Sequence, residues 1–215
     1  VAAVELSGAQ ISRVTLHNFG MVNIFKLKED DEIEIIRSGE VIPKFLEVIK
    51  SSKKKFTYPS DCPVCETPTK VEDIRLLCTN PNCPGKKRES LLYFIQKIGI
   101  ENLSSKRLDE LLKHGLVKDA QDLYKIKEED LLELDKVKEK LAAKIVTSIQ
   151  DSKRTDIITF LSALGISGGA INKCEKIVSY GHNTISKIKK LTPEKLAEID
   201  SFAEKTDDSL VNFEN

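Results

Sequence analysis

Four of the five cysteines stand in two short pairs whose spacing is that of metal ligands. The first pair is Cys62-Pro63-Val64-Cys65, and after twelve residues comes the second, Cys78-Thr79-Asn80-Pro81-Asn82-Cys83. Two such knuckles can bring four thiolates to one tetrahedral zinc ion. Because four protein sulfurs fill its coordination sphere, we expect this zinc to be structural rather than catalytic. An iron–sulfur cluster, disulfides and unbound thiols are the alternatives, and the paired spacing favours zinc.

The segment around these cysteines, residues 56–84, has too little apolar surface for a core of its own. We therefore expect metal binding to supply its folding energy. The fifth cysteine, Cys174, lies in a helical pattern, and we expect it to be a small buried apolar residue. An odd number of cysteines and an N-terminus without an apolar leader argue against a disulfide scaffold, so we expect reduced thiols and a cytoplasmic protein.

Basic residues stand on both sides of the cysteine segment. Lys50 and 53–55 precede it, and Lys86, Lys87 and Arg88 follow it. An ordinary solvated surface would also carry such lysines, but their clustering around a zinc module predicts contacts with nucleic-acid phosphates. The whole chain has 34 Lys and Arg against 34 Asp and Glu, so its net charge is zero. That balance argues against a uniformly basic nucleic-acid protein and leaves room for local patches.

The residues before the cysteines are patterned as short strands. Residues 32–35 alternate between Glu and Ile with a period of two, and a second strand pattern at 41–46 follows a turn. Pro43 has no backbone donor, so we expect it at a sheet edge or a bulge. Asn18 can cap a short helix that follows it. Short strands, turns and one small helix predict a compact barrel such as an OB-fold.

The second half of the chain is helical and contains a repeat. A helical pattern of apolar residues starts at Ser90 and persists almost to the end. Within it, the segments 100–104, 134–138, 166–170 and 199–203 recur at intervals of 34, 32 and 33 residues. The common pattern has apolar residues at the first and fourth positions and small or polar residues at the third and fifth, with Gly169 at the fourth position of the third segment. This order predicts helix-hairpin-helix units, although generic helix pairs can repeat at the same spacing.

The predicted hairpins can bind phosphate through turn amides and through the N-terminus of their second helix. Gly168 would permit close backbone approach in the third turn. Asparagine adopts a left-handed backbone moderately well and lysine or alanine less readily, so we expect weaker backbone contacts that lysine side chains offset. The glycines typical of such turns are mostly replaced, by Asn102, Ser104, Lys136, Lys138, Ala170, Ser201 and Ala203.

The length of the chain and the motifs that it lacks exclude several classes of function. A chain of 215 residues and 24.1 kDa fits one to three domains, and no apolar run reaches the ~18 residues of a membrane span. The sequence contains no GxxxxGK[ST] loop, no GxGxxG and no Asp-Gly pair, and its three histidines are scattered. His114 precedes Gly115 and is expected at a helix C-terminus. We therefore expect no self-sufficient active site in this chain.

In its order of barrel, four-cysteine module and four hairpin units, the chain resembles the C-terminal half of bacterial NAD-dependent DNA ligases. Residues 11–18 (ISRVTLHN) look like that family's VSRATLHN segment, and residues 37–44 (RSGEVIPK) look like its RAGDVIPK segment. The cysteine module, 59–84, is similar to its zinc finger, and residues 115–124 and 161–166 are similar to its helical region. The resemblance covers residues 1–208.

The resemblance implies a protein that seals nicks in duplex DNA. In this family a separate domain uses NAD to adenylate a lysine in a Lys-x-Asp-Gly motif, passes AMP to the 5′-phosphate and joins the ends with Mg²⁺. The 215 residues contain neither that motif nor the family's BRCT domain, so we expect the chain alone to be inactive. By matching position, Arg13 and Arg37 are the first candidates for DNA contact, followed by His17, Asn18 and Lys44.

The sequence thus predicts a multidomain protein: an all-β OB-fold domain at 1–55, a four-cysteine zinc finger at 56–84, an all-α helix-hairpin-helix domain at 85–208 and a tail at 209–215. Its expected partners are nicked duplex DNA and an upstream adenylation domain, with no membrane, and the expected state is a monomer that works at the nucleoid. Structural Zn²⁺ is expected on Cys62, Cys65, Cys78 and Cys83. The predicted DNA contacts are Arg13, His17, Asn18, Arg37, Lys44, Lys86, Lys87, Arg88, Lys106, Lys136, Lys138, Lys140, Gly168 and Lys173.

Two other functions fit parts of this pattern. The first is a non-catalytic module that binds nicked or branched DNA, which the replaced hairpin glycines favour. The second is a zinc-dependent protein–protein scaffold with no role at DNA. Binding of nicked duplex with a salt dependence distinguishes both DNA hypotheses from the scaffold.

Overall fold

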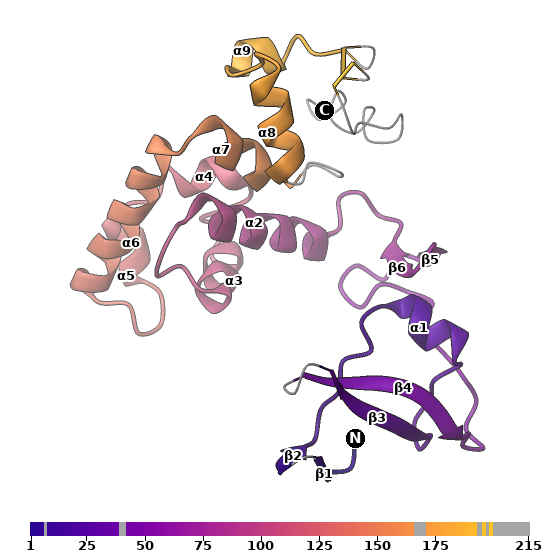
Figure 1. Cartoon of the computed structure of the whole chain (residues 1–215). Coiled ribbons are helices and arrows are strands. Elements are labelled where there is room, and N and C mark those ends of the chain that lie inside the picture. The colour runs from indigo at the N-terminus through magenta and orange to yellow at the C-terminus, as the bar shows by residue number, and fades with distance from the viewer. Residues whose placement is uncertain (7, 39–41, 166–170, 193–194, 197, 200–215) are drawn as a thin grey trace. The chain divides into compact units, whose positions relative to one another are not determined.

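Figure 1 shows the computed structural model, which describes residues 1–6, 8–38, 42–165, 171–192, 195–196 and 198–199. The chain divides into two compact units, Val1–Pro84 and Gly85–Asn215. The strands of the described residues all lie in the first unit, whereas the second unit is helical. This agrees with the change from strand to helix patterning along the sequence. Among the described residues, no helix is long and apolar enough to cross a membrane.

Two antiparallel strand pairs precede the cysteines. The alternation of Glu and Ile buries one face, because Ile33 and Ile35 are half-buried while their glutamate neighbours are exposed. Two register shifts near the start of the strand at residues 32–38 bend this strand against its partner at residues 42–50. Strand β1 (Val4–Leu6) pairs with β2 (Ala9–Ile11), and β3 (Glu32–Ser38) pairs with β4 (Ile42–Lys50).

The strands that were predicted to form a barrel are paired two by two in the described residues. A parallel bridge from Thr15 to Lys44 joins the segment after β2 to β4. Among the described residues the β1–β2 and β3–β4 pairs form separate two-stranded sheets, so their ladders do not close the predicted barrel. Pro43 lies in β4 opposite Arg37 and away from both register shifts. Its expected place on an edge strand is confirmed, and the bulge alternative is not.

Helix α1 (Phe19–Ile24) begins at the predicted cap. Asn18 has an extended backbone, and its Oδ1 accepts a hydrogen bond from the Met21 amide at 3.1 Å. The Phe25 ring, directly after α1, packs edge-on against the Phe45 ring, with centroids 5.0 Å apart. Since Phe45 is only 1% exposed, this contact anchors the end of α1 on the β3–β4 pair.

The cysteine segment folds around one small hairpin. Strand β5 (Thr69–Glu72) pairs with β6 (Arg75–Cys78) in antiparallel register. Only Cys62 and Cys83 are buried in the segment, so it has no apolar core of its own, as the sequence predicted. Its fold must therefore be held by something other than hydrophobic burial.

The second unit is a group of helices around one main apolar core. Fully buried side chains of this core include Ile95, Leu108, Leu111 and Ile145. His114 caps the C-terminal end of the second helix of the unit, and Gly115 follows it with φ of 70°, as predicted. The helices are α2 (Pro84–Ile98), α3 (Ser105–Lys113), α4 (Ala120–Leu123), α5 (Glu128–Leu132), α6 (Glu139–Asp151), η1 (Ser152–Arg154), α7 (Ile157–Ala163), α8 (Ile171–Ser179) and α9 (Ile185–Ile188).

A smaller apolar cluster lies at the C-terminal end of the described residues. Ile177 of α8 packs there with Leu191, Leu196 and Ile199, all of them buried. Cys174 of α8 is also buried, with 2% of its surface exposed, which confirms its predicted role as a small apolar residue. Burial raises the pKa of the Cys174 thiol, so it is held in its neutral form.

Candidate metal centre and nucleic-acid interface

The four paired cysteines meet at one point of the first unit. Their Sγ atoms all lie within 4.8 Å of one another. Cys62 Sγ is 3.8 Å from Cys83 Sγ, and Cys65 Sγ is 3.5 Å from Cys78 Sγ. Four sulfurs around a tetrahedral zinc with Zn–S bonds of ~2.3 Å would lie ~3.8 Å apart. All five cysteines of the chain are free of disulfides, and the arrangement fits one ion with four sulfur ligands.

Two tight turns direct these sulfurs inward. In the first turn, the Glu66 amide donates to the Cys62 carbonyl at 2.9 Å, and Glu66 has φ of 57°. In the second turn, Asn80 Oδ1 accepts a hydrogen bond from the Asn82 amide at 2.9 Å, and the Cys83 amide donates to the Asn80 carbonyl at 3.4 Å. Asn80 therefore shapes the second turn, and the left-handed backbone of Glu66 closes the first.

Hydrogen bonds favour the thiolate form at the first cysteine pair. The backbone amide of Val64, followed by that of Cys65, lowers the pKa of Cys62. Thr67 lowers the pKa of Cys65 to about 6 through its hydroxyl, 3.4 Å from Sγ, and through its amide. Burial raises the pKa of Cys78 to about 12. A metal cation favours every thiolate that it binds, so it would offset the effect of burial at Cys78.

Two segments predicted to contact DNA meet in the first unit. The bridge between Thr15 and Lys44 brings the segment after β2 beside β4. Arg37 pairs through its backbone with Pro43, next to Lys44, while its side chain lies outside the described residues. The side chains of Arg13 and Lys44 are exposed. The bridge thus brings the segment that contains Arg13 beside the strand pair that contains Arg37 and Lys44.

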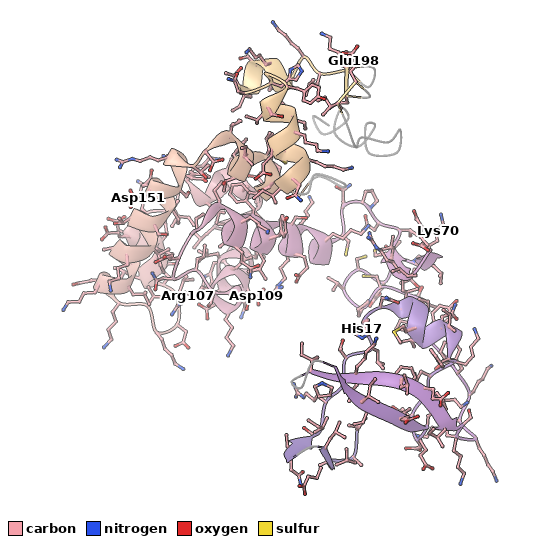
Figure 2. The ribbon with its side chains drawn as sticks, in the orientation of Figure 1. His17, Lys70, Arg107, Asp109, Asp151 and Glu198 are labelled. Carbon is pink, nitrogen blue, oxygen red and sulfur yellow. The ribbon has the colours of Figure 1, made fainter. Side chains whose placement is uncertain are left out.

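His17 and Asn18 form a turn between β2 and α1. His17 has φ of 57° and an exposed side chain, and its amide donates to Thr15 Oγ1 at 3.1 Å (Figure 2). Asn18 Oδ1 accepts from the Met21 amide, so this oxygen is engaged in capping α1. The Asn18 amide NH₂ can still donate to a phosphate. The turn therefore presents His17 outward while Asn18 serves the helix.

The first two predicted hairpins, residues 100–104 and 134–138, have the same backbone at their third position. Asn102 and Lys136 have φ of 61° and 57°, in the left-handed region. Lysine was predicted to adopt this region less readily than asparagine, yet both residues occupy it. The apolar residues on either side fix each turn by their burial, and these are Ile100, Leu103, Leu134 and Val137.

The fifth position of each of these two hairpins is the N-cap of a helix, and neither helix has a side-chain cap. Ser104 and Lys138 have extended backbones at the N-caps of α3 and α6, and neither side chain accepts a hydrogen bond from the helix. In contrast, Asp119 and Asp156 cap α4 and α7 with their carboxylates. The N-terminal amides of α3 and α6 are thus not screened by a cap, which is the condition for binding an anion there.

Arg107 supports the first hairpin and was missed by the sequence reasoning. One of its terminal NH₂ groups (NH1) donates to the Asn102 carbonyl at 2.9 Å, so α3 grips the turn that precedes it. Arg107 Nε is buried and has no hydrogen-bond partner, and the same holds for Oε2 of Glu110 one turn later. Lys106 beside it is exposed and was predicted instead. The signal in the sequence is an arginine three residues after the N-cap, since its guanidinium can reach back and donate to a carbonyl of the preceding turn.

Arg88 was predicted to contact DNA, and the structure places its guanidinium on Asp109. Nε is 2.5 Å from Oδ1 and the second NH₂ group (NH2) is 3.0 Å from Oδ2, while the first (NH1) contacts Glu89. Arg88 lies on α2 and Asp109 on α3, beside Arg107 (Figure 2). The guanidinium lowers the pKa of Asp109. This bidentate pair joins the two helices on either side of the first hairpin.

The other predicted lysines stand at helix starts or in turns. Lys86 and Lys87 lie in the first turn of α2, and Lys106 and Lys140 lie in the first turns of α3 and α6, all exposed. Lys136 lies 3.9 Å from Asp135 in a pair that is exposed on both sides and therefore weak. Lys138 is exposed and Lys173 is half-buried in α8. Gly168, most of the third and fourth turns and the predicted tail at 209–215 lie outside the described residues.

Comparison with known proteins identifies one matching family model and several similar DNA ligases. Residues 1–57 match the family model of the NAD-dependent DNA ligase OB-fold domain. The chain is also 35% identical to a DNA ligase of Helicobacter pylori (strain J99) over 216 residues, which is 98% of this chain and 32% of that protein. Similarity to a DNA ligase of Clostridioides difficile (strain 630) is 32% over 218 residues, again 98% of this chain and 32% of the relative.

A DNA ligase of Wolinella succinogenes is 37% identical over 169 residues, which is 76% of this chain and 26% of that protein. The chain thus spans about a third of the length of the curated relatives that it matches along nearly all of its own length. The predicted OB-fold at the N-terminus and the resemblance to NAD-dependent DNA ligases are therefore confirmed.

Proposed function

We propose that this chain is the DNA-gripping portion, from the C-terminal half, of an NAD-dependent DNA ligase. In this proposal residues 1–55 form the OB-fold domain, 56–84 a zinc finger and 85–208 a helix-hairpin-helix domain, and together they hold a nicked duplex as a monomer in the cytoplasm. The Lys-x-Asp-Gly motif that accepts AMP is absent from these 215 residues. Sealing would thus require an adenylation domain in the same protein, which would use NAD and Mg²⁺, and the 215 residues alone would be inactive.

The matched geometry of the first two hairpins carries the DNA-binding part of the proposal. Asn102 and Lys136 share a left-handed backbone, and the N-cap of a helix without a side-chain cap lies two residues after each. Two such N-termini can each hold one phosphate through backbone amides, without reading the base sequence. Lys106 and Lys140 stand in the first turns of the same helices and add positive charge. The resulting grip suits an enzyme that must act on any sequence.

Structural zinc on the four cysteines is the second part of the proposal. The sulfur separations of 3.5 Å and 3.8 Å and the absence of an apolar core in the segment support it. Zn²⁺ supplies four metal–sulfur bonds that a segment of this size needs in order to fold. With four protein ligands, the ion would leave no position for a substrate, so we assign it no catalytic step.

The test is binding of the 215-residue chain to nicked duplex, intact duplex and an acidic control polymer at several salt concentrations. We expect binding to DNA of every base composition, with log K falling by ~0.9 per phosphate contact for each log unit of salt. Arg13→Ala should weaken binding on all sequences alike. Equal binding to the acidic polymer, or an affinity that does not depend on salt, would reject a DNA role. Failure of the full-length gene product to form an AMP adduct would reject ligation.

A further inference from the structure

Helix α1 takes part of its N-terminal capping from the cysteine segment. Asn18 satisfies the Met21 amide, and the Gly20 amide donates to the Ile74 carbonyl at 2.9 Å. Ile74 lies in the turn between β5 and β6, within the cysteine segment. Both donors belong to the first helical turn, which has no acceptor within the helix. One of the two acceptors therefore comes from outside the OB-fold sequence.

The contact between Gly20 and Ile74 is also close in space. Gly20 is buried, and a Cβ built on it would lie 2.9 Å from both Cβ and Cγ2 of Ile74. Real Cβ atoms do not approach other atoms so closely, so only glycine allows this approach. The turn at Ile74 thus rests directly on the backbone of α1.

Helix α1 is poorly equipped to stand alone. It has six residues, no acidic residue in its first turn and no basic residue in its last turn. Isolated helices of this length are not stable in water and depend on tertiary contacts. The Phe19 ring, in the same first turn, contacts the ring of Tyr58 from the cysteine segment, with the ring centroids 5.1 Å apart. The first turn of α1 therefore depends on the segment that the cysteines hold together, whereas the residue after its C-terminal end packs on Phe45.

We propose that metal binding by the four cysteines orders α1 through the Gly20–Ile74 contact, and that Gly20 is a positioning residue for the turn at His17 and Asn18. Without the ion, the β5–β6 hairpin loses its fold, and the acceptor for the Gly20 amide goes with it. His17 and Asn18 directly precede α1, and Asn18 is its cap. The ion thereby orders the turn at His17 and Asn18, a surface of the OB-fold that contains none of the four cysteines. This inference rests on the proposed function only for its consequence at DNA.

The first experiment measures hydrogen exchange at the Gly20 amide of the whole ¹⁵N-labelled chain, with zinc and after chelation. We expect chelation to speed exchange at Gly20 and Met21 by about tenfold or more, because each amide loses an acceptor or a fixed helix. The Leu108 amide in α3 should keep its protection. Unchanged protection at Gly20 would overturn the proposal, and it would mean that contacts independent of the ion, such as that of Phe25 with Phe45, hold α1. No DNA is present, so failure of the proposed function leaves this result readable.

The second experiment exchanges the two residues in the contact. Gly20→Ala should speed exchange in α1 and lower affinity for nicked DNA several-fold while the chain retains one zinc. The double variant Gly20→Ala/Ile74→Gly removes the two nearest contacted atoms and should restore part of the protection, because the third contacted atom, Asn18 Oδ1 at 3.0 Å, remains. Ile74→Val keeps Cβ and Cγ2 and should behave as the parent, as should Asn23→Ala in the same helix. Normal protection in Gly20→Ala, or no rescue in the double variant, would overturn the positioning role.

Discussion

Asn102 and Lys136 are 34 residues apart and adopt the same left-handed backbone, with φ of 61° and 57°, at the third position of two helix-joining turns. Neither residue is the glycine that such a conformation favours. Buried apolar residues flank both positions, so packing on the helical core imposes the conformation on whatever side chain is present. The turns are therefore defined by what surrounds these two residues.

Lys136→Gly should stabilise the chain, because it removes the strain of a left-handed side chain. We expect the free energy of unfolding to rise by about 1 kcal/mol, measured by denaturant titration. The same variant should lower the salt dependence of DNA binding by about one phosphate contact. Lys138→Gly is the matched control, since Lys138 has φ of −114° in the same turn. If both variants changed stability alike, the strain argument would be wrong.

Arg107→Ala should loosen the first hairpin. It removes a charged donor from the Asn102 carbonyl, a hydrogen bond worth about 1.5–3 kcal/mol. We expect lower stability together with weaker DNA binding at unchanged salt slope, because the guanidinium holds the turn and does not neutralise a phosphate. Lys106→Ala, at the exposed neighbouring position, should do the reverse and reduce the salt slope with little effect on stability. Calorimetry and a salt titration of binding separate the two patterns.

Cys62→Ser should abolish metal binding and unfold residues 56–84. Three remaining thiolates cannot complete a closed structural site, and the segment has no core to replace it. Elemental analysis should find zinc reduced from one ion per chain to near zero, and limited proteolysis should cut between the cysteines. Cys174→Ala, outside the cluster, should retain its zinc. An intact, protease-resistant Cys62→Ser protein would contradict a structural metal.

The Arg88–Asp109 pair makes stability depend on pH in a defined direction. Arg88 lowers the pKa of Asp109 below its usual value of 3.8, so the folded state favours the carboxylate. This contribution is present above about pH 4 and is lost as the pH falls through the lowered pKa. Asp109→Asn should cost about 1 kcal/mol at pH 7, since both side chains are partly exposed.

The difference in unfolding free energy between the parent and Asp109→Asn should therefore shrink when it is measured below pH 4. A difference that stays constant down to pH 3 would show that ionisation of Asp109 contributes nothing. Glu89→Gln is a suitable control, because Glu89 contacts the same guanidinium through a more exposed carboxylate.

Local signals in the sequence predicted local structure well. The Glu-Ile alternation indicated β3, Asn18 indicated the cap of α1, and the paired cysteines indicated a cluster of four sulfurs. These features depend on side-chain period, capping and turn chemistry, all of which act over a few residues.

The contacts that join elements could not be predicted from such patterns. Arg88 and Asp109 are 21 residues apart, and the sequence alone made Arg88 resemble any other basic residue near a zinc module. Gly20 and Ile74 come from different segments, and their contact depends on how the cysteine segment folds back on α1. Which residues from distant segments contact each other is decided by tertiary packing, and the pattern of a single sequence does not reveal that packing.

The helical unit has a second, smaller apolar cluster around Ile177, so its parts differ in their resistance to local unfolding. Among the described residues, this cluster has four buried members and the main core has many more, so the described members oppose the opening of α8 with less hydrophobic free energy than the main core opposes that of α3. On heating or under mechanical force, helices α8 and α9 can therefore unfold while the first two hairpins stay folded. A chain bound to a long polymer through these two hairpins can then stay attached after its C-terminal helices have unfolded.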